Sequence, residues 1–270
     1  MKIKNPVFRQ GYTPITDLDD PYERNTLMKF GILKLESDES YFFSARYEKA
    51  LLLLTGSVKF SWGSGESNLA SEASASRTSL FDENPACLHL PEGINVTVTA
   101  ENLESELVIV QTQNGRSFKE MYFPPGECRI ELRGAGTMRE TSTRIVRTIF
   151  DQSNRPEANL VLGEVIDYPG KWSSYPPHHH PQPEIYHYRF LPENGFGFAM
   201  LGNDVVKVQH GDTVLILNDA SHPQVSAPGY AMYYVWVIRN LDGNPYGTPI
   251  FEPEHTWVQK PDAKIWPYNA

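Results

Sequence analysis

Cysteine is scarce in this chain, because only Cys87 and Cys128 occur among its 270 residues. Two cysteines cannot form the disulfide framework of a small secreted protein, and this favours a reducing compartment. Long hydrophobic runs are also missing: the longest, ALLLL at 50–54, is far shorter than the roughly 20 residues of a membrane-spanning helix. The first residues, MKIKNPVFRQGYTPITD, contain no hydrophobic segment of the signal-peptide type. We therefore expect a soluble, cytoplasmic protein without a membrane partner.

Basic residues are also in short supply. The chain has 24 lysines and arginines against 33 acidic residues, which gives a formal net charge of -9. An acidic surface repels phosphate backbones, so we expect no nucleic-acid partner.

Helical periodicity is rare, and short strands fit the sequence better. The 21 prolines and 19 glycines interrupt the chain often. Between them lie segments rich in β-branched and aromatic residues, for example 94–99, 106–112, 213–217 and 231–238. This pattern predicts an all-β protein, and its length predicts two domains or one duplicated architecture.

A weak internal similarity supports the duplication. Residues 31–60 align with residues 162–198 when Glu48 is set against Glu184: each stretch has a strand, a polar turn and a carboxylate that enters a hydrophobic strand. The histidines of the second copy have no counterpart in the first. We therefore predict an N-terminal unit, 1–140, that lacks metal ligands and a C-terminal unit, 141–270, that binds a metal.

Histidines cluster in the stretch KWSSYPPHHHPQPEIYHYRF, residues 171–190. In an extended segment His178 and His180 project to the same side, and Glu184 returns to that side after the proline turn. His222, about 40 residues on at the end of another strand, supplies a further imidazole. Imidazole nitrogen and carboxylate oxygen together suit a divalent transition metal. A flexible polar loop is the alternative for the histidine run alone, and the distant His222 favours the metal site.

Several longer motifs carry a family resemblance. The stretches KWSSYPPHHH, EIYHYRF, HPQVSAPGYAMYYVWV and PEHTWV, with RTSLFDENPACLHL in the first half, resemble the 5-deoxy-glucuronate isomerases of inositol catabolism, members of the cupin superfamily. The resemblance implies two tandem cupin-type antiparallel β-barrels, a bicupin of the double-stranded β-helix or jelly-roll type. It also implies a divalent zinc, manganese or iron ion in the second barrel, held by His178, His180, Glu184 and His222. The segment 239–253 differs from the family pattern and reads as a local insertion.

The implied reaction converts 5-deoxy-glucuronate, a small sugar acid, into 2-deoxy-5-keto-gluconate in myo-inositol catabolism. An aldose–ketose isomerase of this kind moves a proton between adjacent carbons and must stabilise a developing negative oxygen. Glu184, Tyr186 and Tyr234 are the catalytic candidates, because a carboxylate and hydroxyls that face the cavity can carry protons.

Cationic side chains are the candidates for binding the substrate carboxylate. Lys171 and Arg147 are assigned this role, with Arg144 as a further candidate, because a guanidinium binds a carboxylate in bidentate fashion. Trp236 is expected to be core packing.

Three other functions remain open at this point. The same ligands would suit another hexuronate ketol-isomerase or an iron-dependent cupin dioxygenase, since ligand type does not select among these metals. A non-catalytic sugar-binding bicupin is the third. A homodimer is a possible assembly, because such a fold exposes β edges.

Overall fold

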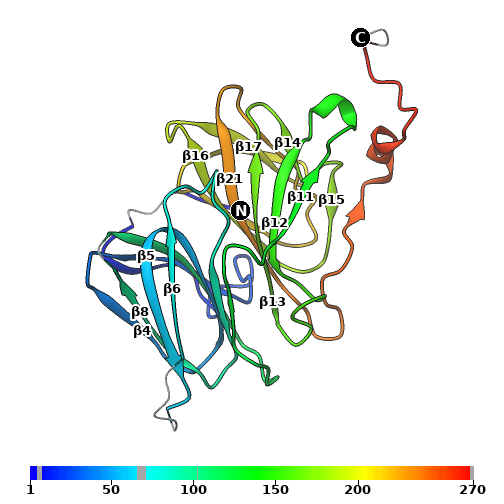
Figure 1. Cartoon of the computed structure of the whole chain (residues 1–270). Coiled ribbons are helices and arrows are strands. Elements are labelled where there is room, and N and C mark those ends of the chain that lie inside the picture. The colour runs from blue at the N-terminus through cyan, green and yellow to red at the C-terminus, as the bar shows by residue number, and fades with distance from the viewer. Residues whose placement is uncertain (5–7, 66–70, 102, 268–270) are drawn as a thin grey trace.

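The computed structural model describes residues 1–4, 8–65, 71–101 and 103–267, and it confirms the all-β prediction. Two β-sandwich units lie side by side, with the blue and cyan first half beside the green to orange second half (Figure 1). Helical turns are confined, in these ranges, to the 3-10 segments η1 (Met138–Glu140) and η2 (Pro253–Gln259). No helix within the described ranges has both the length and the hydropathy needed to cross a membrane.

The first unit is built around one long strand. Strand β5 pairs with β7 and β9 along its apolar first part and with β6 and β8 along its second part, so it runs through both layers of the sandwich. The main path of the sheet is β10-β7-β5-β9-β3-β2. The strands are β2 (Gly11–Thr16), β3 (Lys29–Leu35), β4 (Ser40–Phe43), β5 (Glu48–Gly63), β6 (Ser71–Arg77), β7 (Cys87–Leu90), β8 (Asn95–Ala100), β9 (Ser105–Thr112) and β10 (Met121–Phe123).

The second unit packs a seven-stranded sheet, in the order β1-β19-β16-β21-β13-β12-β11, with a four-stranded sheet, β14-β20-β17-β18. A third sheet consists of β15 and β22 alone. The strands are β1 (Lys2–Ile3), β11 (Arg129–Arg133), β12 (Arg144–Phe150), β13 (Leu160–Asp167), β14 (Trp172–Ser173), β15 (His178–His179), β16 (Glu184–Leu191), β17 (Phe196–Leu201), β18 (Asp204–Gln209), β19 (Thr213–Ile216), β20 (Gln224–Ser226), β21 (Ala231–Arg239) and β22 (Ile250–Phe251).

Two strands from the first 140 residues complete the sheet of the second unit. Strand β1 pairs with β19, and β11 pairs with β12 in register from Arg129↔Thr148 to Arg133↔Arg144. The domain boundary at residue 140 remains a prediction, and both strands lie on its N-terminal side.

Strand β16 shows how the second unit separates its two buried faces. Tyr186 and Tyr188 belong to the core inside the sandwich, whereas Ile185 belongs to the core shared with the first unit. Because side chains alternate along a strand, Glu184 faces the interior with the tyrosines and His187 faces the first unit. The alternation therefore brings a carboxylate into the sandwich.

A shared hydrophobic core and a buried ion pair join the units. Phe30 and Leu52 of the first unit pack in one cluster with Leu162 and Val237 of the second. Beside it, the Arg77 guanidinium donates hydrogen bonds of 2.6 and 2.9 Å to the two oxygens of Glu164. The Tyr233 hydroxyl donates a third, of 2.5 Å, to the same carboxylate.

Candidate active site

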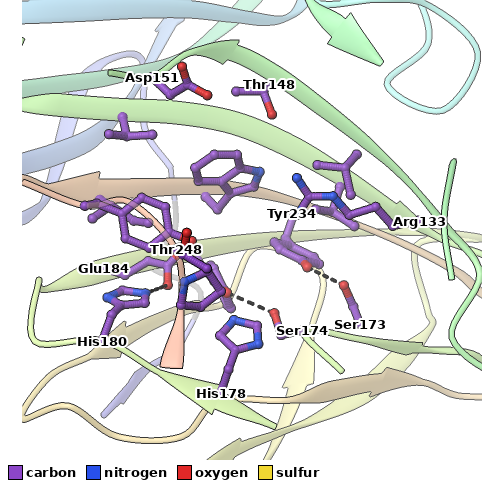
Figure 2. A pocket seen from close by; sticks show the side chains of 18 of the residues that line it. Arg133, Thr148, Asp151, Ser173, Ser174, His178, His180, Glu184, Tyr234 and Thr248 are labelled. Carbon is purple, nitrogen blue, oxygen red and sulfur yellow. Dashed lines mark hydrogen bonds and ion pairs between the residues drawn. The ribbon is translucent and has the colours of Figure 1, made fainter. Parts of the chain in front are cut away.

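A cavity of about 240 Å³ opens into the second unit. Strands β11, β12, β13, β16 and β21 form its walls, together with β15, the loop before it and the segment 246–249 that precedes β22. Figure 2 shows the side chains of this cavity pointing toward one another from these separate segments. The lining residues used below are Arg133, Arg144, Ser173, Ser174, His178, His180, Glu184, Tyr186, Tyr234, Trp236, Tyr246 and Thr248.

Three of the predicted ligands form a compact group. His180, Glu184 and His222 are buried, and each offers a nitrogen or oxygen within 4.8 Å of the others. Glu184 Oε2 lies 3.2 Å from Nε2 of His180 and 3.3 Å from Nε2 of His222. The structure therefore brings together side chains from β16, from the loop before it and from the turn after β19.

Backbone carbonyls fix the orientation of the imidazoles. Nδ1 of His180 lies 3.0 Å from the carbonyl oxygen of Gln182, and Nδ1 of His222 lies 2.8 Å from that of Ala220. A carbonyl oxygen only accepts hydrogen bonds, so each Nδ1 carries the hydrogen. Burial lowers the pKa of His222, which keeps this ring neutral. Its Nε2 lone pair is thus directed at the Glu184 carboxylate.

This arrangement fits a cation. Nε2 of His222 has no hydrogen-bond partner among the described residues, although a carboxylate oxygen lies 3.3 Å away. Two acceptors that face each other at this distance repel unless a positive ion or a proton lies between them. Imidazoles that donate their second nitrogen to a carbonyl are typical metal ligands, because that bond sets both tautomer and ring orientation.

His178 lies beside the group. It borders the cavity, and its ring packs edge-on against His222 with 4.9 Å between ring centres. Its Nδ1 donates to the carbonyl oxygen of Pro176 at 3.2 Å, as in the other two histidines. Burial, followed by the neighbouring His222, lowers the pKa of His178 to about 3. The ring is therefore neutral, and its place as a fourth ligand stays a prediction.

The predicted catalytic tyrosines both border the cavity. The Tyr186 hydroxyl lies 3.1 Å from Ser174 Oγ, and the Tyr234 hydroxyl lies 2.5 Å from Ser173 Oγ. Figure 2 shows both bonds on the side of the cavity that also holds His178. Burial raises the pKa of both phenols, so each is a protonated hydroxyl that can donate a hydrogen bond.

The predicted carboxylate-binding residues lie elsewhere. Arg147 faces the first unit, where it donates to the carbonyl oxygens of Leu80 and Phe81. It differs in direction from Arg144 because the two are three positions apart in one strand. Lys171 lies over the ring of Tyr168, 5.4 Å from its centre. Neither Arg147 nor Lys171 borders the cavity.

Arg144 borders the cavity instead. Its side chain is buried and donates to the carbonyl and hydroxyl oxygens of Ser142, and no carboxylate among the described residues forms an ion pair with it. Asp167 lies opposite Arg144 across β12 and β13 and interacts with it electrostatically without a direct ion pair. A buried guanidinium without a direct ion pair is stabilised when an anion from outside approaches it. Trp236, expected to be core packing, also borders the cavity, and its buried indole N–H has no hydrogen-bond partner among the described residues.

The segment 239–253 supplies residues that sequence reasoning missed. Tyr246 packs edge-on against His180, with 4.8 Å between ring centres, and Thr248 also borders the cavity (Figure 2). The only signal in the sequence was the departure of this segment from the family pattern.

The profile of the KduI/IolB family matches residues 2–258. A 5-deoxy-glucuronate isomerase of Geobacillus thermodenitrificans is 31% identical over 172 residues, which cover 57% of this chain and 59% of the relative. The chain thus matches less than two thirds of that relative's length. Another, from Shouchella clausii, is 25% identical over 95% of this chain and 97% of its own length.

Solved structures show the same fold. An IolB-like protein of Salmonella typhimurium is similar with a TM-score of 0.83 and 21% identity, over 96% of this chain and 99% of that one. A variant of Bacillus subtilis oxalate decarboxylase is similar with a TM-score of 0.66 and 11% identity, over 96% of this chain and 81% of that one. The two-unit, cupin-type architecture that the resemblance implied is confirmed.

Proposed function

Because this chain belongs to the KduI/IolB family, we propose that it is a metal-dependent aldose–ketose isomerase that converts 5-deoxy-glucuronate into 2-deoxy-5-keto-gluconate. The curated relatives bear the name of this isomerase, and the reaction would serve myo-inositol catabolism. The substrate is a sugar acid that offers a carbonyl and a neighbouring hydroxyl at one end and a carboxylate at the other.

One observation carries the proposal: a single small cavity is lined both by His180 and Glu184 of the His–Glu–His group and by a buried arginine, Arg144, that forms no direct ion pair among the described residues. The first suits the carbonyl end of a sugar acid, and the second suits its carboxylate. Arg144 therefore replaces Lys171 and Arg147 as the proposed carboxylate-binding residue. The indole N–H of Trp236, which has no partner in the described part of the chain, offers a further donor to a sugar hydroxyl.

The proposed roles of the side chains follow from their positions. His178, His180, Glu184 and His222 would hold a zinc, manganese or iron ion, which when bound polarises a carbonyl and stabilises negative charge on its oxygen. Glu184 moves the proton between the two reacting carbons. The hydroxyls of Tyr186 and Tyr234 donate to the substrate oxygens on the opposite side of the cavity.

A direct assay tests the function. The purified protein, stripped with a chelator and reloaded with zinc, manganese or iron, is incubated without oxygen with 5-deoxy-glucuronate and with other hexuronates, and products are followed by NMR. We expect ketose formation that depends on added metal. Faster turnover of another hexuronate would favour a different ketol-isomerase, strict dependence on oxygen would favour a dioxygenase, and binding without turnover would favour a sugar-binding protein.

Substitution of Arg144 tests the orientation of the substrate. A charge-assisted hydrogen bond is worth about 1.5–3 kcal/mol, so Arg144→Met is expected to raise KM by roughly 10- to 100-fold. Lys171→Met is the matched control and should leave KM unchanged. A raised KM in Lys171→Met with an unchanged KM in Arg144→Met would instead assign the substrate carboxylate to Lys171.

A further inference from the structure

Arg133 of β11 lies directly opposite Arg144 of β12 in the register of the seven-stranded sheet. Residues that face each other across an antiparallel pair point to the same side, with Cβ atoms about 4.5–5.5 Å apart. Both side chains accordingly line the cavity, and Figure 2 shows the side chain of Arg133 pointing into it. One wall of the cavity thus carries two neighbouring guanidinium groups.

Two carboxyl groups beside these arginines balance them only in part. Asp167 lies opposite Arg144 on its other side, and its oxygens form no direct ion pair with it. Glu131 accepts a hydrogen bond of 2.8 Å from Nη2 of Arg133, but the two side chains are 38% and 48% exposed, and an ion pair this exposed contributes little stability. Like charges directly opposite each other in a sheet repel, so the arginine pair favours an added anion.

Arg133 has donors left for such an anion. A guanidinium offers five N–H groups, and within the described ranges the bond to Glu131 is the one hydrogen bond that Arg133 makes. Glu131 is also shared, because Nε of Arg129 lies 3.6 Å from the same oxygen. Arg129 borders the cavity too, but it is held by Asp151, to which it donates at 2.7 Å. Arg133 can therefore turn to a ligand at small cost, whereas Arg129 would first have to leave a closer partner.

We propose that Arg133 and Arg144 together bind the substrate carboxylate, and that Arg133 selects anionic sugars over neutral ones. A carboxylate has two oxygens with about four lone-pair sites, so it can accept from two guanidinium groups at once. A neutral aldose with the same carbonyl end would leave both groups without an anion. The inference rests on the proposed isomerase function, and it adds a second contact to that of Arg144.

Steady-state kinetics of the metal-loaded full-length enzyme with 5-deoxy-glucuronate test the contact. We expect Arg133→Met to raise KM roughly 10-fold with little change in kcat, because a charge-assisted hydrogen bond to the carboxylate is lost. Arg133→Lys should restore part of the loss, since an ammonium keeps the charge but not the planar fork. In the double variant Arg133→Met/Arg144→Met the two increases in KM should not multiply, because both residues bind one carboxylate. Increases that multiply fully would assign the two arginines to separate groups and overturn the inference.

Two neighbours of Arg133 provide matched controls. Arg129→Met removes the same charge from the same strand and should change KM less than about twofold, because the Arg129 guanidinium is held by Asp151. Glu131→Gln breaks the exposed ion pair and should not raise KM. A rise in either variant equal to that in Arg133→Met would overturn the inference, because the general charge of the strand or the ion pair itself would then explain the effect.

Binding measured without turnover separates this inference from the proposed function. Calorimetry with glucuronate, and with glucose as its neutral counterpart, should show a roughly 10-fold weaker affinity of Arg133→Met for glucuronate alone. A wild type that isomerises a sugar acid, with an Arg133→Met variant of unchanged KM and affinity, overturns the inference and leaves the function. A wild type that binds glucuronate through Arg133 but isomerises no sugar acid supports the arginine pair and overturns the function. A wild type that binds no sugar acid overturns both.

Discussion

The imidazoles of His178, His180 and His222 share one feature: each donates its Nδ1 hydrogen to a backbone carbonyl two residues away in the sequence. The carbonyls belong to Pro176, Gln182 and Ala220, and the proline-rich turns around them hold the chain in place. These hydrogen bonds orient each ring before a cation binds and leave its Nε2 available as a ligand.

Removal of one imidazole is expected to remove the metal. His180→Ala should lower the metal content of the purified protein well below one equivalent and lower isomerase activity accordingly, because it removes one of the four proposed ligands and leaves only Glu184 and His222 of the compact group. Metal analysis after dialysis measures this directly. His179→Ala is the control from the same run of histidines, since its ring bonds to Asp219 and lies outside the group. Equal metal loss in both variants would refute the ligand assignment.

His187 is buried on the opposite face of β16. Its Nδ1 donates to Thr213 Oγ1 at 2.9 Å, and its Nε2 accepts from Arg189 at 2.6 Å. The rings of Phe8 and Phe30 pack against it. Burial first, then the charges of Arg189 and His210, holds the pKa of His187 well below its ordinary value of 6.5.

The low pKa of His187 makes stability depend on pH. Below pH 6.5 the unfolded chain binds a proton at His187 that the folded chain does not, so stabilisation present above pH 6.5 is lost as the pH falls. Between pH 7 and 5 the free energy of unfolding should fall by about 2 kcal/mol more in the wild type than in His187→Gln. Urea titrations of the metal-free proteins at both pH values measure the difference. An equal fall in the free energy of unfolding of the wild type and of His187→Gln between pH 7 and 5 would show that His187 titrates normally.

The cluster of proposed metal ligands was easier to predict from the sequence than the substrate contacts, for a physical reason. His180, Glu184 and His222 are chemically distinctive, and two of them are tied to one turn. Arg144 and Arg147 are alike in type and lie in one strand, so only the face that each presents separates them, and that depends on the packing of the first unit against the second.

Gly163 of β13 leaves room for a large side chain of the neighbouring strand, β21. It pairs with Trp236 across β13 and β21, and a Cβ at Gly163 would lie 2.5 Å from the indole ring and 2.6 Å from the carbonyl oxygen of Arg147. The missing side chain thus gives the indole room to lie over β13, where it borders the cavity.

Gly163→Ala is expected to disturb this arrangement. The added methyl should lower the free energy of unfolding by about 1–3 kcal/mol and raise KM, because the indole must leave its place at the cavity. Thermal unfolding and steady-state kinetics measure the two effects. Gly202→Ala serves as a control for stability: a Cβ there meets no atom within 4 Å, although its positive φ of 60° brings a backbone cost without crowding. An unchanged KM in Gly163→Ala would show that Trp236 does not contribute to substrate binding.

Most strands were predictable because β-branched and aromatic runs end at glycine or proline turns. The predicted strand at 106–112 matches β9 (Ser105–Thr112), and 213–217 matches β19 (Thr213–Ile216). The contribution of β1 and β11 to the second sheet was not predictable, since each finds its partner through long-range register and carries little periodicity of its own.

The two units share one core, so we expect them to unfold together. The buried pair between Arg77 and Glu164 crosses between the units, and removal of one partner leaves an uncompensated charge. Glu164→Gln should therefore cost about 3–5 kcal/mol and lower the unfolding midpoint of the whole molecule. Glu72→Gln, which breaks the exposed pair with Lys59, should change it little.

Circular dichroism and tryptophan fluorescence measure this cooperativity, because Trp62 lies in the first unit and Trp236 in the second. Coincident transitions in wild type and in Glu164→Gln are the expected result. Two separated transitions would show that each unit holds its structure without the other.

Strand β1 has a consequence for biosynthesis. Ile3 pairs with Thr213, about 210 positions later in the chain. At roughly 5–20 residues per second, a ribosome that has made the first strand needs on the order of 10–40 s to make its partner. During translation β1 must wait unpaired, and the edge of β19 that it covers stays open at least until residues 213–216 have been made.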